Sequence, residues 1–346
     1  MTIREVFYFT AFTALVGWGL VIGKTIILPV VVAVMLTYVL VGATKAIRRL
    51  PVLGAMPVWL AYVLAVSIFG AALATISLVA VSNLRDIARA ELAYEEDVLR
   101  LIGGVLSAFG LADAPTWENL RQIVIDRVDM TDLSIDLLAT LASTGGYVVL
   151  ISTYIVFMVI ERVPLARKIE MVLPEESGRG ASADIFKRIN DQIVTYLSTK
   201  TLIGVIIGVL SWLLLTIMGI ENAVFWAFLI GLFNYVPYVG SIVAVAVVVI
   251  YSAFAYGSLQ LTLTALVTLT AAQVYVGNWL EPRIMSRTMN LSPLTVLLAL
   301  VVWASLWGLP GAIIAVPMTS ILLITLAAFQ STRPVAILAS RDGDLF

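Results

Sequence analysis

One break in a long apolar run carries groups suited to contact a polar solute. Residues 232–240 read Leu-Phe-Asn-Tyr-Val-Pro-Tyr-Val-Gly, so Asn234 and Tyr238 flank Pro237 and Gly240 follows. Pro237 has no N–H and disfavours helix at the preceding residue, whereas Gly240 permits close packing or unusual dihedrals. Backbone carbonyls freed in this way are tolerated in a membrane only inside protein or beside water. The segment predicts either a break that contacts solute or ions, or a plain turn between two helices.

A second polar group stands where another apolar run ends. Asn278, Glu281 and Arg283 place an amide, an acid and a base within six positions. An ionisable residue at membrane depth is a functional candidate, which favours Glu281. The alternative is an interfacial cap with a local pair between Glu281 and Arg283. Gln273, earlier in the same run, either lines a path or only joins helices.

Polar residues also lead directly into the apolar run that begins at Thr201. Asp191, Gln192 and Lys200 are the candidates for a cytoplasmic gate. Lys200 has an alternative role, because a long basic side chain at a helix end commonly extends to the lipid headgroups. Near the C-terminus, Gly308 and Gly311 flank a Leu-Pro pair and predict a second broken helix.

The chemistry that remains open is narrow, because the chain has no histidine and no cysteine. Imidazole bases, Ser–His dyads and zinc sites built from histidine or cysteine are therefore excluded. An aspartyl dyad would need two intramembrane aspartates, which the sequence does not offer. The nucleotide-binding pattern GxxxxGK[ST] does not occur, so no ATP-driven motor is visible. We expect neither an enzyme nor a cofactor, metal or nucleic-acid site.

The elements that position these residues are membrane helices. Of 346 residues, 61% are hydrophobic and only 12% are charged, whereas a soluble domain is typically about 25% charged. A helix needs about 20 apolar residues to cross a bilayer. The sequence predicts an all-α membrane protein with about eight hydrophobic segments. They lie at 6–23, 25–44, 56–82, 139–160, 201–219, 223–256, 257–279 and 292–328.

Basic residues predict the orientation of these segments, since cytoplasmic loops are rich in Lys and Arg. The loop with Lys45, Arg48 and Arg49 and the loop around 162–188 are expected inside, with the N-terminus. The stretch 83–138 has eleven acidic and five basic residues and is expected outside. Its apolar residues recur at helical spacing, which predicts a small amphipathic helical subdomain.

The C-terminal half allows two topologies. If 223–256 crosses once, Arg283 and Arg287 lie outside. If 223–256 is a re-entrant hairpin turning at 234–237, both arginines lie inside, and 292–328 forms a second hairpin of opposite orientation. The second topology agrees with the charge rule and resembles the inverted arrangements that place sites near the membrane midplane.

The corresponding domain organisation has six parts. They are N-terminal transmembrane helices, an acidic subdomain, one transmembrane helix, a cytoplasmic loop with an amphipathic helix, a transport core and a cytoplasmic tail. Their bounds are 1–82, 83–138, 139–160, 161–200, 201–330 and 331–346.

The motifs together resemble the autoinducer-2 exporter family of bacterial membrane proteins. The resemblance rests on Asp191-Gln192 with Lys200, on 234–240, on Asn278 with Glu281-Pro282, on 291–294 and on 308–317. It implies a transport role, cytoplasmic termini and a place in the bacterial plasma membrane. Members are associated with export of the signal autoinducer-2, and others with sodium/proton antiport. Ser292 stands where the family often has histidine, which weakens the case for proton coupling there.

Three functions follow as hypotheses. The first is a secondary transporter or facilitator that exports a small polar solute, and the second is a cation/proton antiporter using Glu281 or Asp191. The third is a membrane scaffold without transport. The expected pathway residues are Asn234, Pro237, Tyr238, Gly240, Gln273, Asn278, Glu281, Gly308 and Gly311. The expected partners are the lipid bilayer, a small polar solute or monovalent cation, and further copies of the chain in a homo-oligomer.

Overall fold

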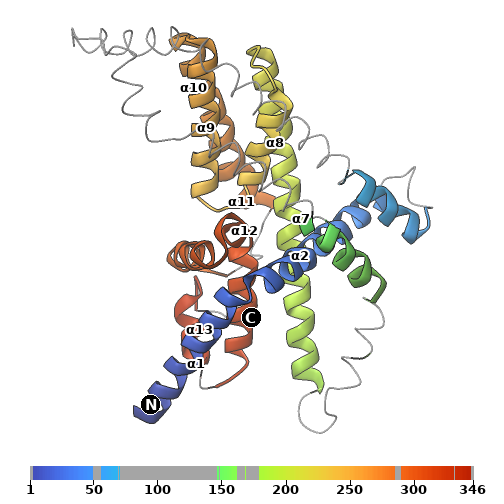
Figure 1. The fold of residues 1–346 in the computed structure, drawn as a ribbon, viewed down its shortest axis with the longest axis vertical. Coiled ribbons are helices and arrows are strands. Elements are labelled where there is room, and N and C mark those ends of the chain that lie inside the picture. Colours follow the sequence, from blue (N-terminus) through green and yellow to red (C-terminus); the bar gives the residue numbers. More distant parts are fainter. Residues whose placement is uncertain are drawn as a thin grey trace. The chain divides into compact units, whose positions relative to one another are not determined.

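Helices account for the regular structure in the parts of the chain that are described (Figure 1). The structure is a computed structural model. It describes residues 3–49, 56–68, 70, 146–147, 149–161, 168, 179–284, 290–330 and 332–343. The predicted acidic subdomain at 83–138, like Arg287, lies outside the described residues. Within those residues the prediction of an all-α protein is confirmed.

The chain forms two compact units, each assembled from separated segments. Unit 1 comprises Met1–Tyr62, Gly146–Thr199 and Arg287–Phe346. Unit 2 comprises Val63–Gly145 and Lys200–Ser286. The long helix α7 (Arg179–Ile217) contributes to both, because the boundary falls between Thr199 and Lys200.

Unit 2 is built from the second half of α7 and the helices that follow it. These are α8 (Ala223–Phe233), α9 (Val239–Tyr256), α10 (Leu259–Tyr275), the π-helix η2 (Val276–Leu280) and α11 (Glu281–Ile284). Helix α9 packs against both α8 and α10. The predicted turn at 234–237 therefore separates two packed helices. Ser258 starts α10 by accepting a hydrogen bond from the Leu261 N–H, as an N-cap residue does.

Glycines bring α7 and α8 of unit 2 into close approach. A Cβ atom on Gly231 would lie 2.6 Å from the carbonyl oxygen of Gly204, and one on Gly204 would lie 3.0 Å from that of Gly231. Small residues at such contacts are how membrane helices pack backbone to backbone. The small-xxx-small spacing of Gly204 and Gly208 thus serves a helix–helix contact.

Unit 1 contains α1 (Ile3–Ile22), α2 (Lys24–Arg49), α12 (Pro293–Ala327) and α13 (Arg333–Ala339), besides the first half of α7. Helix α12 is broken at Gly308, whose φ of 67° and ψ of −145° are not helical. The indole N–H of Trp303 donates to Thr319 Oγ1 at 3.0 Å, although the two residues are sixteen positions apart. In a straight helix they would be about 24 Å apart, so the two arms of α12 fold back on each other.

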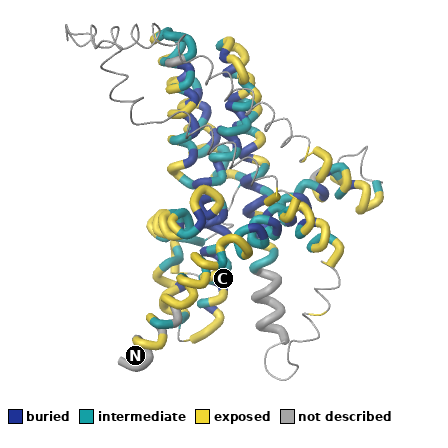
Figure 2. Tube along the Cα trace, in the orientation of Figure 1, coloured by how far each residue is buried: buried dark blue, intermediate teal, exposed yellow. Residues whose placement is uncertain are grey.

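The surfaces of these helices are apolar, as a lipid environment requires. Figure 2 shows buried and exposed residues alternating along the helices of unit 2. Ile217, Ile242 and Val267 are among its exposed large apolar side chains. Four described helices are long and apolar enough to cross a membrane. They run over Lys24–Arg49, Ile189–Ile217, Leu259–Ile284 and Pro293–Ala327.

Shorter apolar helices occur at Val58–Ile68, Val149–Glu161, Ala223–Phe233 and Val239–Ala253. The total of eight membrane segments and the re-entrant course of the hairpins stay predictions.

Candidate functional site

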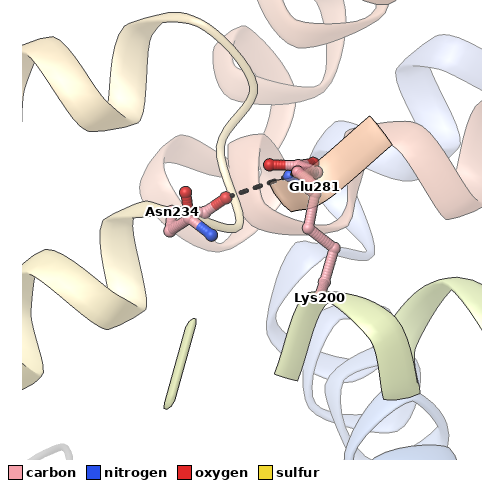
Figure 3. A network of polar contacts seen from close by, with 3 residues as sticks. All are labelled: Lys200, Asn234 and Glu281. Carbon is pink, nitrogen blue, oxygen red and sulfur yellow. Dashed lines mark hydrogen bonds and ion pairs between the residues drawn. The ribbon is translucent and has the colours of Figure 1, made fainter. Parts of the chain in front are cut away.

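A largely buried ion pair lies among the polar residues of unit 2. The Lys200 ammonium on α7 pairs with the Glu281 carboxylate at the start of α11, and it donates to the backbone carbonyl of Asn234 at 3.4 Å. Figure 3 shows the carboxylate and the carbonyl converging on the same ammonium. The side chain of Lys200 is 7% exposed and that of Glu281 18%. The cluster joins three segments that are far apart in sequence.

The break after α8 supplies the carbonyl that Lys200 contacts. Helix α8 ends at Phe233, and the chain turns through 234–238 before α9 begins. Pro237 cannot donate to a preceding carbonyl, and the last carbonyls of a helix carry partial negative charge. A cation at this end of α8 is therefore stabilised. The alternative of a Lys200 extended to the headgroups is wrong, because the side chain is buried and paired with Glu281.

The residues that follow Lys200 and Asn234 in the sequence, Thr201 and Tyr235, also contact each other. Thr201 Oγ1 and the Tyr235 hydroxyl are 2.6 Å apart, within hydrogen-bond distance. This contact ties α7 to the turn next to the Lys200–Asn234 contact. The sequence analysis missed both residues, because nothing in their local spacing indicates a partner 34 positions away.

The π-helix η2 sets the position of Glu281. It widens the helical path for five residues between α10 and α11, and such π segments are frequent at functional sites. The capping alternative predicted a local pair between Arg283 and Glu281, but the structure does not contain this pair. The Arg283 guanidinium lies 3.6 Å above the centre of the Trp279 ring. The carboxylate is thereby left to Lys200.

Two amide nitrogens near the broken segments stay without a partner. Asn234 is 8% exposed, and its Nδ2 has no hydrogen-bond partner among the described residues. The same holds for Nε2 of Gln273 on α10, within the described part of the chain. A buried donor left unpaired costs about 1–3 kcal/mol. Such groups call for a polar ligand or water.

Comparison with known proteins places the chain in a transporter family. A profile of AI-2E family transporters matches residues 8–331, which is most of the sequence. The chain belongs to the AI-2E transporter family. The resemblance stated from the motifs is thus confirmed.

Relatives within this family have transport names. The AI-2 transport protein TqsA of Escherichia coli (strain K12) is 31% identical over 227 residues, which are 64% of this chain and 63% of that protein. A Haemophilus influenzae protein provisionally named a transport protein is 28% identical over 236 residues, 68% of this chain and 67% of its own. A Borreliella burgdorferi protein, also provisionally named a transport protein, is 36% identical over 137 residues, which are 39% of this chain and 38% of that protein.

These alignments span between 38% and 67% of the relatives' own lengths. The family and the apolar helices together indicate a multi-pass membrane protein of a transporter family. The family description and the name of the Escherichia coli relative refer to transport.

Of the remaining predicted residues of unit 2, Tyr238 and Gly240 shape the turn beside the site, whereas Asn278 lies apart from the site. Tyr238 has a φ of 60°, rare for a residue with a side chain, and it is exposed at the turn. A Cβ atom on Gly240 would collide with the Phe233 carbonyl, so glycine allows α9 to start against the end of α8. Asn278 is exposed within η2 and does not join the cluster.

Four of the predicted residues belong to unit 1, namely Gly308, Gly311, Asp191 and Gln192. Gly308 holds the break of α12, and Gly311 lies where a Cβ atom would collide with the Trp303 carbonyl. Asp191 is exposed. Gln192 lines a hollow with Asn290, Ser320 and Ser340, which the sequence analysis did not anticipate.

Proposed function

We propose that the chain is a secondary transporter or facilitator that exports a small polar solute across the bacterial plasma membrane. One observation carries the proposal. Lys200, Glu281 and Asn234 form a largely buried polar cluster at a helix break, and the Asn234 Nδ2 has no partner in the described part of the chain. Ionisable groups inside membrane proteins commonly mark a substrate or ion path. Asn234 supplies the solute contact, Pro237 and Gly240 shape the break, and Gln273 supplies a second amide.

Autoinducer-2 is the candidate solute, because one relative is an AI-2 transport protein. Without a nucleotide-binding motif, export runs down a gradient or couples to an ion. Sodium/proton antiport is less favoured, since the Glu281 carboxylate already has a cationic partner in Lys200. We also expect a homo-oligomer, with 83–138 available for contacts between copies.

We propose that α8 with α9, and the two arms of α12, are re-entrant hairpins of opposite orientation. Both termini then lie in the cytoplasm, and so does the α11 end of the α10–α11 span. Helix breaks at the midplane are the usual position of transporter sites. Pro237 and the glycines at 240, 308 and 311 favour this arrangement.

Arg283→Cys tests this topology directly, because the chain has no cysteine of its own. Arg283 is exposed, so a thiol there is accessible to reagent. We expect an impermeant maleimide to label it in inside-out vesicles and not in intact cells. Lys24→Cys places a second thiol at an exposed position on α2. The side of the membrane from which this thiol reacts is compared with the side from which the thiol of Arg283→Cys reacts. Labelling of Arg283→Cys from intact cells would exclude the re-entrant course of α8 and α9.

Flux through reconstituted liposomes tests the transport proposal. We expect the purified chain to move autoinducer-2 or another small polar solute from a panel above the leak of empty vesicles. Asn234→Ala should lower that flux about tenfold, because one hydrogen bond to a ligand is worth roughly 1.4 kcal/mol. Gln260→Ala changes an exposed amide on α10 and is the matched control. A folded chain that moves no solute, or an Asn234→Ala flux equal to the control, would refute the proposal.

A further inference from the structure

The Lys200 ammonium contacts two oxygen atoms. One comes from the Glu281 carboxylate and one from the Asn234 carbonyl at the end of α8. The hydroxyls of Thr201 and Tyr235 belong to the neighbouring residues on the same two segments. Carbonyls at the ends of broken helices coordinate Na⁺ in many transporters, and here a carboxylate accompanies such a carbonyl.

We propose that Glu281 and the Asn234 carbonyl form a monovalent-cation site whose resident cation is the chain's own Lys200 ammonium. Charge balance supports this occupant. The ammonium neutralises the carboxylate, so a second cation in the same buried place would add an uncompensated charge at high cost. Arg283, a basic residue two positions from Glu281, is exposed and lies over Trp279 instead. The unaltered site therefore needs no free Na⁺ or K⁺.

A consequence is that removing the lysine should create a site for a free cation. Lys200→Ala leaves the Glu281 carboxylate and the Asn234 carbonyl without their partner and frees the space of the lysine stem. A ligand that binds only the folded state stabilises it by mass action. We expect the melting temperature of Lys200→Ala in detergent to be at least about 3 °C higher in 0.5 M NaCl than in 0.5 M choline chloride. The unaltered chain should show no such difference.

Two control variants separate this effect from a general response to salt. Lys24→Ala removes an exposed lysine on α2 and should respond as the unaltered chain does. Lys200→Ala combined with Glu281→Gln removes the carboxylate as well, so its melting temperature should be the same in both salts. Equal melting of Lys200→Ala in both salts, or an equal rise in the double variant, would overturn the proposal.

Measurements on the unaltered chain decide the question even if Lys200→Ala does not fold. Its melting temperature in sodium, potassium and choline chloride should be the same, and a selective rise with one alkali cation would overturn the proposal. The transport part of the inference rests on the proposed function. Solute flux should persist when choline replaces sodium and potassium, and an absolute need for either would also overturn it. If no solute moves at all, the proposed function fails, while the melting temperatures still test the cation site.

Discussion

Glu281→Gln is expected to lower the free energy of unfolding by about 3 kcal/mol. The change keeps the shape of the side chain but removes the negative charge, and the Lys200 ammonium, with its side chain 7% exposed, then lies buried without its partner. Lys200→Met should lower the stability by a similar amount, because it leaves the carboxylate alone. Unfolding followed by tryptophan fluorescence in detergent, with increasing denaturant, measures both values.

The double variant Lys200→Met with Glu281→Gln should recover most of this loss. Replacing both members of a buried ion pair by groups of similar shape is often nearly neutral, so the double variant should differ from the unaltered chain by less than about 1 kcal/mol. The difference between this value and the sum of the single losses is the coupling energy of the pair. Arg283→Met is the control for the loss of one basic side chain, and about 0.5 kcal/mol is expected for its exposed contact with Trp279. If the losses of the two single variants simply add, Lys200 and Glu281 do not interact in the folded protein.

The sequence predicted the helix breaks better than it predicted the contacts around them. The Pro and Gly residues at 237, 240, 308 and 311 act on their own backbone, so their effect is readable locally. Accordingly, the chain turns between α8 and α9 at 234–238, and α12 breaks at Gly308. The apolar runs likewise follow from composition and length, which hardly depend on tertiary structure.

Contacts between residues far apart in the sequence could not be predicted from the sequence alone. Lys200 and Glu281 are 81 positions apart, and a helix-end lysine in isolation favours extension toward the headgroups. Arg283, two residues from Glu281, was the obvious local partner, yet Trp279 is near enough to stack with it instead. The π-helix η2 left no trace in composition, because its five residues are ordinary for a membrane helix. Because η2 could not be predicted, the exposure of Asn278 within it could not be predicted either.

Gly240→Ala is expected to cost about 3 kcal/mol of unfolding free energy and to abolish solute flux. The added methyl group would collide with the Phe233 carbonyl and lie 2.9 Å from Val236 Cβ. Backbone atoms cannot move aside as a flexible side chain can, so α9 must shift away from the end of α8. That shift would move the Asn234 carbonyl away from Lys200. Denaturant unfolding and liposome flux measure the two effects.

A graded series of glycine substitutions separates this collision from a general effect of alanine. An added Cβ would lie 2.6 Å from the nearest atom at Gly231 and 3.4 Å at Gly208. At Gly277 it would meet nothing within 4 Å beyond the adjacent residues and the backbone of its own helix. The stability loss should therefore fall from Gly240 to Gly231 to Gly208. Gly277→Ala should be neutral or stabilising by about 0.5–1 kcal/mol, because alanine favours helix over glycine. A Gly240→Ala chain as stable as Gly277→Ala would mean that α9 does not begin against the last carbonyls of α8, and the Asn234 carbonyl would then lack the support that holds it beside Lys200.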